Sequence, residues 1–403
     1  MRIVCVGGGP AGLYFSITMK RRHPDYDITV LEREAPGATY GWGVTYWGSL
    51  LTRLQQNDPQ SAEVIGRSSV RWEQGLAHIR GGTVTHRSDE AFGMGRHRLL
   101  EILSRRATEL GVEIEHERGV ESLDHIPPAD LVVASDGVNS RVRRLHTDRF
   151  GPTLTEGRNK YIWLGTSKIF DAFTFAFVET AHGWIWLYGY GFSGELSTCV
   201  VECPPETWTG LGLDHLSTEA GTALLERLFA DQLDGHALIT RPDGTGSQWL
   251  SFRTLTNRNW HHGNLVLLGD AAHTTHYSIG AGTILALEDA IGLADALHRH
   301  PELSAALAGY ERERRRAILP TQSAAHYSAR WYENIHRYTH LTPDQFFALL
   351  GQRHSPLLPQ VPPRLYYRVN QAAEDVTVLR ELRGRLGRRV ARTLHARRGI
   401  EPD

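Results

Sequence analysis

The sequence has few cysteines, no excess charge of either sign and no long apolar run. Its three cysteines, Cys5, Cys199 and Cys203, include no CxxC pair, and an odd number without a leader argues against a disulfide framework. No segment offers about eighteen consecutive apolar residues, and the apolar start breaks into glycines too early for a secretory leader. These absences predict a soluble protein of a reducing cytoplasm.

The balance of charge excludes a further class of partner. Lysine and arginine together number 44, aspartate and glutamate 45, and the formal net charge is -1. Such a chain has no overall attraction for nucleic acid or anionic membrane, and we expect neither as a partner. Its 403 residues predict two lobes, because domains average about 100–200 residues.

The N-terminus carries a glycine motif between a strand and a helix. Gly7, Gly9 and Gly12 form GxGxxG: the first permits a tight turn, the second lets a pyrophosphate approach, and the third lets helix pack on strand. A second strand ends at Glu32, beside Arg33, where a carboxylate can accept hydrogen bonds from ribose hydroxyls. The motif predicts half of a Rossmann-like nucleotide site; a loop that serves packing alone is the alternative.

Two later strands each end in an aspartate beside a glycine. "ADLVVASDGVNSRVR" leads to Asp136 and Gly137, and "GNLVLLGDAAH" leads to Gly269 and Asp270. A carboxylate there can bind a ribityl hydroxyl or backbone amides, while glycine lets a flavin ring or pyrophosphate pass close. These motifs favour FAD over NAD as the resident nucleotide.

The order GxGxxG, DG, GD resembles the FAD-dependent aromatic hydroxylases of the group A flavoprotein monooxygenase family, over residues 1 to 300. The resemblance implies that Asp136 serves FAD and transient NADH or NADPH, and that Asp270 contacts the ribityl chain. It also implies that Arg96, in "GRHRLLEIL", reaches the ribityl and phosphate region; a solvated arginine at a helix start is the alternative. The implied fold is α/β, a glutathione-reductase-type FAD-binding domain with an inserted β-sheet substrate domain.

The loop after the GD motif departs from the commoner pattern of this family. Tyr277 and Ile284 stand where proline and asparagine are usual, whereas Asp289 is the acidic residue that the family has. The loop still predicts flavin contacts, since its amides and the following helix N-terminus can stabilise negative charge on reduced flavin. The residues expected to contribute are Gly280, Ala281, Gly282 and Thr283.

These departures resemble a narrower branch, the salicylyl-CoA and 2-aminobenzoyl-CoA hydroxylases with the violacein-pathway indole hydroxylase. "YGWGV" at 40–44 and the stretches 157–175, 196–203 and 328–338 extend the likeness over nearly the whole chain. The violacein enzyme lacks the typical residues around "DAAH" and "LEDA", which this chain keeps. The resemblance therefore favours an aryl thioester of CoA or of an acyl carrier protein as substrate.

The second lobe should supply an aromatic pocket. Runs of strand length between residues 157 and 203 alternate bulky and small side chains, which predicts a sheet with one buried face. Flat rings pack well on an arene. The candidate substrate-binding residues are Trp42, Trp47, Trp186, Tyr188 and Tyr277, and the alternative for the strand aromatics Trp184, Trp186, Tyr188 and Tyr190 is a place in the core.

The family's chemistry implies a flavin C4a-hydroperoxide, formed from reduced flavin and O2, that hydroxylates an electron-rich ring. The flavin is the reagent, so His276 and Tyr46 are candidates only for catalytic contacts. His273 and His276 lack a third ligand of suitable spacing, and we expect no metal site.

Three alternatives stay open. Tyr46 and Trp47, in "GWGVTYW", favour an indole or tryptophan-derived substrate. From another class, the chain could be a flavin electron-transfer or oxidase module that inserts no oxygen, or a nucleotide sensor without activity.

The motifs predict a discontinuous FAD-binding domain at 1–150 and 255–300, and a substrate-binding β-sheet domain at 151–254. Residues 301–403 read as a helical region interrupted at Pro320, with an extended linker at 354–364. The segment 380–398 carries eight arginines. This basic tail is either a solvated face or a contact for CoA phosphates or the acidic helices of a carrier protein.

Overall fold

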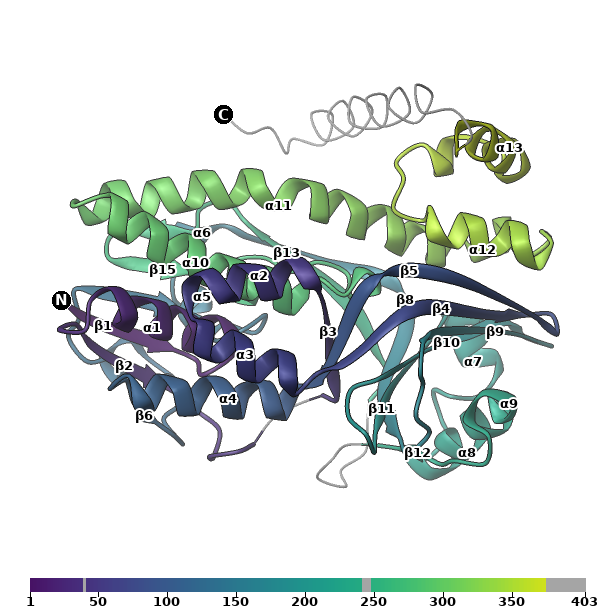
Figure 1. Cartoon of the computed structure of the whole chain (residues 1–403), viewed down its shortest axis with the longest axis horizontal. Coiled ribbons are helices and arrows are strands. Elements are labelled where there is room, and N and C mark those ends of the chain that lie inside the picture. The colour runs from purple at the N-terminus through teal and green to yellow at the C-terminus, as the bar shows by residue number, and fades with distance from the viewer. Residues whose placement is uncertain (39–40, 241–247, 375–403) are drawn as a thin grey trace.

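The computed structural model describes residues 1–38, 41–240 and 248–374. A six-stranded sheet has the order β14-β15-β7-β1-β2-β6 and is parallel except for its β14 edge (Figure 1). Its strands are β1 (Arg2–Val6), β2 (Asp27–Leu31), β6 (Glu113–Glu115), β7 (Leu131–Ala134), β14 (His261–His262) and β15 (Leu265–Leu267). The helix α1 (Pro10–Arg22) packs against α4 (Arg96–Glu109) and α10 (Gly282–Arg299). The predicted strand–glycine–helix–strand unit is present.

The second sheet has nine strands in the order β12-β8-β11-β10-β9-β4-β5-β3, with β13 paired to β8. Its later strands are β8 (Pro152–Thr166), β9 (Phe173–Thr180), β10 (Gly183–Gly191), β11 (Ser197–Cys203), β12 (Leu238–Ile239) and β13 (Leu250–Asn257). The strand runs expected between 157 and 203 are thus β8, β10 and β11.

The large sheet also takes strands from the N-terminal part of the chain. These are β3 (Gly43–Trp47), β4 (Val70–Ile79) and β5 (Gly82–Gly95). β4 pairs in parallel with β9, for example at Gly75 and Phe173. Residues 43–95 therefore leave the first sheet and build the second, so the structure differs here from a division at residue 150, because strand pairing joins segments that are far apart in sequence.

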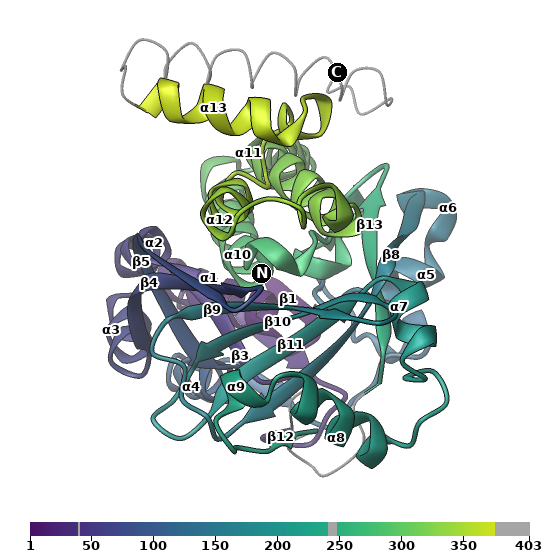
Figure 2. The same ribbon diagram turned by 90° about the vertical axis from the view of Figure 1, so that its right-hand side faces the viewer.

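Helices cover both faces of the large sheet (Figure 2). On one face, α7 (Pro205–Gly210), α8 (Thr218–Leu228) and α9 (Ala230–Leu233) enclose a core that includes Ile185, Leu187, Cys199 and Cys203. On the other, Trp184, Trp186 and Tyr188 pack with residues of α11 (Leu303–Glu333) and α12 (Pro343–Gly351). The period of two in a strand separates these sets. Cys5, Cys199 and Cys203 are all free and buried.

The remaining helices are α2 (Gly48–Asn57), α3 (Pro59–Arg67), α5 (Arg141–Leu145), α6 (Thr147–Phe150) and α13 (Pro363–Glu374). The prediction of an interruption at Pro320 is wrong, because α11 continues through it. Pro320 is exposed, so water can satisfy the carbonyl that loses its partner. The expected extended linker contains a 3₁₀ turn at Leu358–Gln360 with Leu358 buried. The arginine-rich segment lies outside the described residues. Among the residues that the structure describes, no helix is long and apolar enough to span a membrane.

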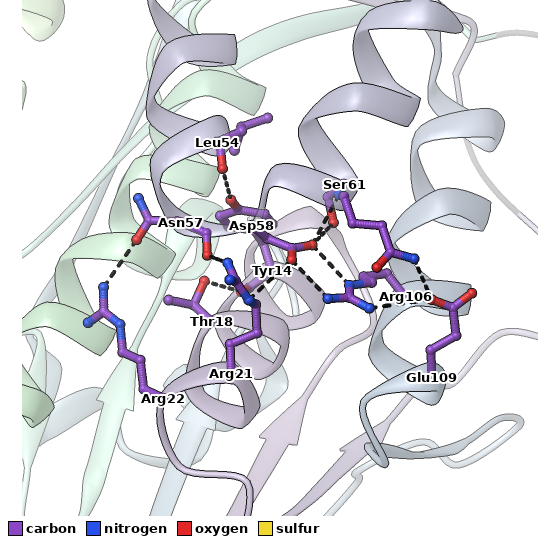
Figure 3. A network of polar contacts seen from close by, with 11 residues as sticks. Tyr14, Thr18, Arg21, Arg22, Leu54, Asn57, Asp58, Ser61, Arg106 and Glu109 are labelled. Carbon is purple, nitrogen blue, oxygen red and sulfur yellow. Dashed lines mark hydrogen bonds and ion pairs between the residues drawn. The ribbon is translucent and has the colours of Figure 1, made fainter.

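A buried carboxylate joins the helices α1, α3 and α4 (Figure 3). Asp58 precedes α3 and accepts a hydrogen bond from the Ser61 amide at 3.1 Å, which caps the helix. Its side chain is 1% exposed and pairs with Arg106 of α4 at 3.0 Å and Arg21 of α1 at 3.3 Å. Burial alone would raise the pKa of this carboxyl, but Arg106 and Ser61 hold it below its usual range.

We expect Asp58→Asn to lower the free energy of unfolding by about 1–3 kcal/mol, because asparagine keeps the cap while the charged hydrogen bonds are lost. Urea denaturation measures this. Glu109→Gln is the matched control, since Glu109 is a half-exposed partner of Arg106 at 3.5 Å and should change stability by less than about 1 kcal/mol. An equal loss of stability in the two variants would contradict a special stabilising role for the buried Asp58 carboxylate.

Candidate functional site

A cleft of about 2040 Å³ runs between the carboxyl ends of the first sheet and one face of the second. Almost all predicted cofactor-binding residues line it: Gly7, Gly9, Glu32, Arg33, Arg96, Asp136, Asp270, Gly280, Ala281, Gly282 and Thr283. Gly12 lies behind them, in α1. Residues of six separate segments thus meet in one space.

Each of the three motif positions requires a glycine for a different geometric reason. Gly7 has φ +105°, and a Cβ there would lie 2.5 Å from the Ser135 carbonyl oxygen. A Cβ on Gly12 would lie 2.4 Å from the Gly7 carbonyl oxygen, whereas one on Gly9 would meet only the Ser135 carbonyl oxygen, at 4.0 Å. Gly9 therefore keeps space open on the cleft side, and no side chain caps the N-terminus of α1. This geometry fits a pyrophosphate on the helix end.

Glu32 is held at the glycine loop. Its carboxylate accepts hydrogen bonds from the Gly8 amide at 2.6 Å and the Glu34 amide at 2.9 Å. Further lone pairs remain for ribose hydroxyls. Arg33 pairs with Glu34 at 2.9 Å on the cleft rim.

The DG and GD motifs are joined by an arginine. Asp136 Oδ2 accepts hydrogen bonds from the amides of Arg141 and Val142, at 2.7 and 3.2 Å, while Oδ1 is buried without a partner among the described residues. Arg143 donates to the Ala271 carbonyl at 2.9 Å. An unpartnered carboxylate oxygen beside the cleft fits a hydroxyl-bearing ligand.

Arg96 and Asp270 bring opposite charges to the same cleft. Burial lowers the pKa of the Arg96 guanidinium, and the charge of Asp270 acts against this. Arg96 is only partly exposed and lines the cleft, a position that fits the ribityl and phosphate region better than a solvated helix start.

The loop from Tyr277 to Thr283, called the flavin loop below because flavin contacts are predicted for it, turns sharply before α10. Gly280 has φ +64°, and a Cβ there would lie 2.5 Å from Thr45 Oγ1. The helix expected after the loop is α10, which starts at Gly282. No side chain caps it, so its first amides are free to face an electron-rich ligand. Ser278 also shares a hydrogen bond of 2.7 Å with Ser328 of α11.

"DAAH" and "LEDA" form one buried polar cluster. His273 Nε2 and Asp289 Oδ2 are 2.8 Å apart, and Arg314 Nε donates to Asp289 Oδ1 at 2.7 Å. Burial would raise the pKa of Asp289, but His273 and Arg314 outweigh it and hold the pKa below its usual range. The imidazole of His273 is therefore bonded to Asp289, whereas that of His276 is bonded to Ser278, so the two histidines do not share a partner. The described residues hold no group of three potential metal ligands.

Beyond the flavin loop, aromatic side chains line the cleft. They are Trp47, Trp72, Tyr161, Trp163, Phe173, Phe175, Tyr188, Tyr190, Phe252, Tyr277 and Phe347. Of these, the sequence predicted Trp47, Tyr188 and Tyr277 as substrate contacts and left Tyr190 between pocket and core, although the alternation of Phe173 with Phe175 is a signal for a shared face. The other contributors come from separate strands and from α12, which only the tertiary structure brings together.

The five substrate candidates divide into two groups. Trp47, Tyr188 and Tyr277 lie on the cleft, and Trp47 has 43% of its surface exposed. Trp42 and Trp186 are not among the described cleft-lining residues. Trp42 packs against Gly165, and Trp186 stacks on Tyr332 of α11 at 5.6 Å, because α11 covers that part of the sheet.

The two catalytic candidates also lie off the described cleft lining. His276 accepts a hydrogen bond from the Ser278 amide and stacks on Tyr277 at 4.5 Å; burial lowers its pKa to about 3, which keeps it neutral. Tyr46 bonds to Ser69 and stacks on Phe92, and burial raises its pKa to about 12. Neither position supports direct contact with a substrate.

Three relatives align with most of this chain. Salicyloyl-CoA 5-hydroxylase from a Streptomyces species is 36% identical over 86% of this chain and 68% of its own. The 3-hydroxy-4-methyl-anthranilyl-[aryl-carrier protein] 5-monooxygenase of Streptosporangium sibiricum is 38% identical, over 83% and 90%. Protodeoxyviolaceinate monooxygenase of Chromobacterium violaceum is 31% identical, over 89% and 96%.

Solved structures share the fold. A tetrameric form of 2-methyl-3-hydroxypyridine-5-carboxylic acid oxygenase has a TM-score of 0.67 at 19% identity, covering 83% of this chain and 91% of its own. PqsL, a probable FAD-dependent monooxygenase from Pseudomonas aeruginosa, has 0.66 at 20%, covering 87% and 99%. Residues 126–321 match the family described as FAD binding domain. With its glycine loop, paired aspartates and flavin loop on one cleft, the chain belongs to the FAD-dependent monooxygenases of this family.

Proposed function

We propose that the protein hydroxylates an electron-rich ring of the hydroxy- or aminobenzoyl type, carried as a thioester of CoA or of an acyl carrier protein, with NADH or NADPH as electron donor. One observation carries the proposal: the aromatic wall of the cleft continues directly into the flavin loop, through Tyr277 and Gly280. The names of the two aryl-thioester relatives support the substrate class.

The side chains would act by placing the ring and excluding water. FAD, when bound, supplies the redox chemistry and the activation of O2. Rings such as Phe173, Phe175 and Tyr188 hold an arene beside the loop, and the free amides at the start of α10 stabilise negative charge next to it. This division requires no side-chain nucleophile.

Arg353 supports an acyl substrate. Its guanidinium lies 5.7 Å from the centre of the Phe175 ring and donates to the Ser278 carbonyl at 3.0 Å, while Nε has no hydrogen-bond partner among the described residues. No carboxylate of the described residues forms an ion pair with it. A cation in an aromatic cleft favours a carbonyl or phosphate oxygen.

The test follows NAD(P)H oxidation by the FAD-loaded protein with salicyl-CoA, 2-aminobenzoyl-CoA, their free acids and tryptophan, with mass analysis of the products. We expect a gain of one oxygen with a thioester, at a kcat/KM roughly a hundredfold above that of the free acid, because remote binding energy positions the ring.

Two other results would redirect the assignment. Oxygen insertion only into tryptophan would favour an indole-type substrate, which Trp47 on the cleft and the violacein-pathway relative also suit. Oxidation of NAD(P)H that yields peroxide and no oxygenated product with any compound would favour an oxidase. Protein freed of FAD is the control for background oxidation.

A further inference from the structure

Glu202 is a buried carboxyl behind the aromatic wall of the cleft. It lies in β11, is 1% exposed, and is absent from the described lining of the cleft. Asn159 Nδ2 donates to its Oε1 at 2.7 Å, and the hydroxyls of Tyr188 and Tyr277 donate to its Oε2 at 2.9 and 2.5 Å. No lysine, arginine or histidine of the described residues pairs with it. Three neutral donors therefore compensate for the cost of burying this group.

The two phenols connect Glu202 to the cleft. Their hydroxyls point to one carboxyl oxygen, and their rings line the cleft. The ring of Tyr277 lies 4.7 Å from that of Tyr161 and meets that of Tyr188 edge-on at 6.1 Å. Trp186 Nε1 donates to the Tyr188 hydroxyl at 3.0 Å, which fixes that hydroxyl from a second side. Glu202 is thus the shared acceptor that ties the two rings to each other.

Tyr277 also begins the flavin loop. It opens the 3₁₀ turn Tyr277–Ile279, and Gly280 follows in a left-handed conformation just before α10. Glu202, a side chain of the nine-stranded sheet, therefore anchors Tyr277, the first residue of the flavin loop. In a hydroxylation, the ring must be held in register with the flavin, and an error of about 1 Å can cost on the order of a hundredfold in rate.

We propose that Glu202 is a positioning residue that, through Tyr277 and Tyr188, fixes the position of the aromatic pocket relative to the flavin loop. It thereby determines what fraction of the NAD(P)H oxidised yields hydroxylated product rather than hydrogen peroxide. The inference rests on the proposed function for its catalytic consequence. Its geometric part, the anchoring of the flavin loop, is independent of substrate.

The variants are Glu202→Leu, which removes all three bonds, Glu202→Gln, which keeps the size and one oxygen that can accept from the two tyrosine hydroxyls, and Tyr277→Phe, which removes one bond. Glu206→Gln is the matched control, because Glu206 is a surface residue of the same lobe, paired with Arg158 at 3.0 Å. Visible circular dichroism of bound FAD reports on the flavin environment without any substrate. Product and peroxide per NAD(P)H oxidised report on coupling, with salicyl-CoA as the first substrate.

We expect Glu202→Leu to change the flavin dichroism and to lower product per NAD(P)H on the order of tenfold, with Glu202→Gln restoring most of both. Tyr277→Phe should change both in the same direction, and adding Glu202→Gln to it should have little further effect. The Glu206 control should match wild type. Flavin dichroism in Glu202→Leu and Tyr277→Phe identical to wild type would overturn the proposal. If the leucine variant does not fold, Tyr277→Phe decides by the same criterion: a changed flavin dichroism supports the proposal and an unchanged one overturns it. A wild type that oxygenates none of the compounds would count against the proposed function alone, since the dichroism still tests the anchoring.

Discussion

Alanine at Gly12 is expected to destabilise the protein and weaken FAD binding, whereas alanine at Gly9 should weaken FAD binding alone. The added Cβ at Gly12 would lie 2.4 Å from the Gly7 carbonyl oxygen and 2.5 Å from Ser135 Oγ, so α1 must move away from the strand loop. Overpacking of this kind costs about 1–3 kcal/mol. The added Cβ at Gly9 meets no described protein atom nearer than 4.0 Å, but it enters the space where the pyrophosphate is expected.

Two measurements separate these effects. Urea denaturation of the FAD-free protein should show the loss of stability for Gly12→Ala and none for Gly9→Ala. Fluorescence titration with FAD should show affinity lowered roughly 10- to 100-fold in both, which corresponds to the same energy range. Gly221→Ala is the control: this glycine lies inside α8, and its Cβ would meet Leu213 at an ordinary 3.9 Å. FAD affinity unchanged by Gly9→Ala would show that the pyrophosphate does not approach the loop there.

The nucleotide site could be predicted because its signals are local. Gly7, Gly9 and Gly12 lie within six residues, in the loop after β1 and the first turn of α1, and Asp136 and Asp270 follow closely on short buried strands. The residues of each motif are neighbours in the sequence, and the backbone conformation of the motif fixes where their side chains lie. The spacing in the sequence is therefore enough to predict their relative positions. The way that Arg143 joins the two aspartate motifs requires the tertiary structure.

The aromatic pocket could be predicted only in part, because its walls are assembled over long distances. Tyr188 and Trp186 share a strand face, yet α11 covers Trp186 and leaves Tyr188 on the cleft. Only long-range packing decides this. Glu202 was missed although the sequence holds a signal: it is the one charged residue of β11, whose seven residues are all buried. A buried carboxylate in an apolar strand demands partners and indicates a constraint worth testing.

Replacement of Asp289 by asparagine should lower the free energy of unfolding by about 3 kcal/mol, because one partner of a buried charged cluster is lost. Asp289 is fully buried between His273 and Arg314, and the cluster supports the turn that carries Asp270. Glu288→Gln is a close control, since Glu288 is the neighbouring residue, contacts the same arginine at 3.3 Å, and is one-third exposed. It should cost less than about 1 kcal/mol. A loss as large as that of Asp289→Asn would assign the stability to Arg314 alone.

The acid limb of the stability curve tests the charge on Asp289 directly. Its pKa is held below the usual range in the folded protein, so the folded state binds fewer protons than the unfolded one near the ordinary aspartate pKa of about 3.9. The stabilisation from this group is therefore fully present above about pH 5 and is lost as the pH falls toward the lowered pKa. Urea unfolding of wild type and Asp289→Asn from pH 7 to pH 3 should give curves that converge in acid, since asparagine has no proton to bind. A constant difference across this range would mean that the lost stability comes from packing or hydrogen-bond geometry and not from the carboxylate charge that His273 and Arg314 share.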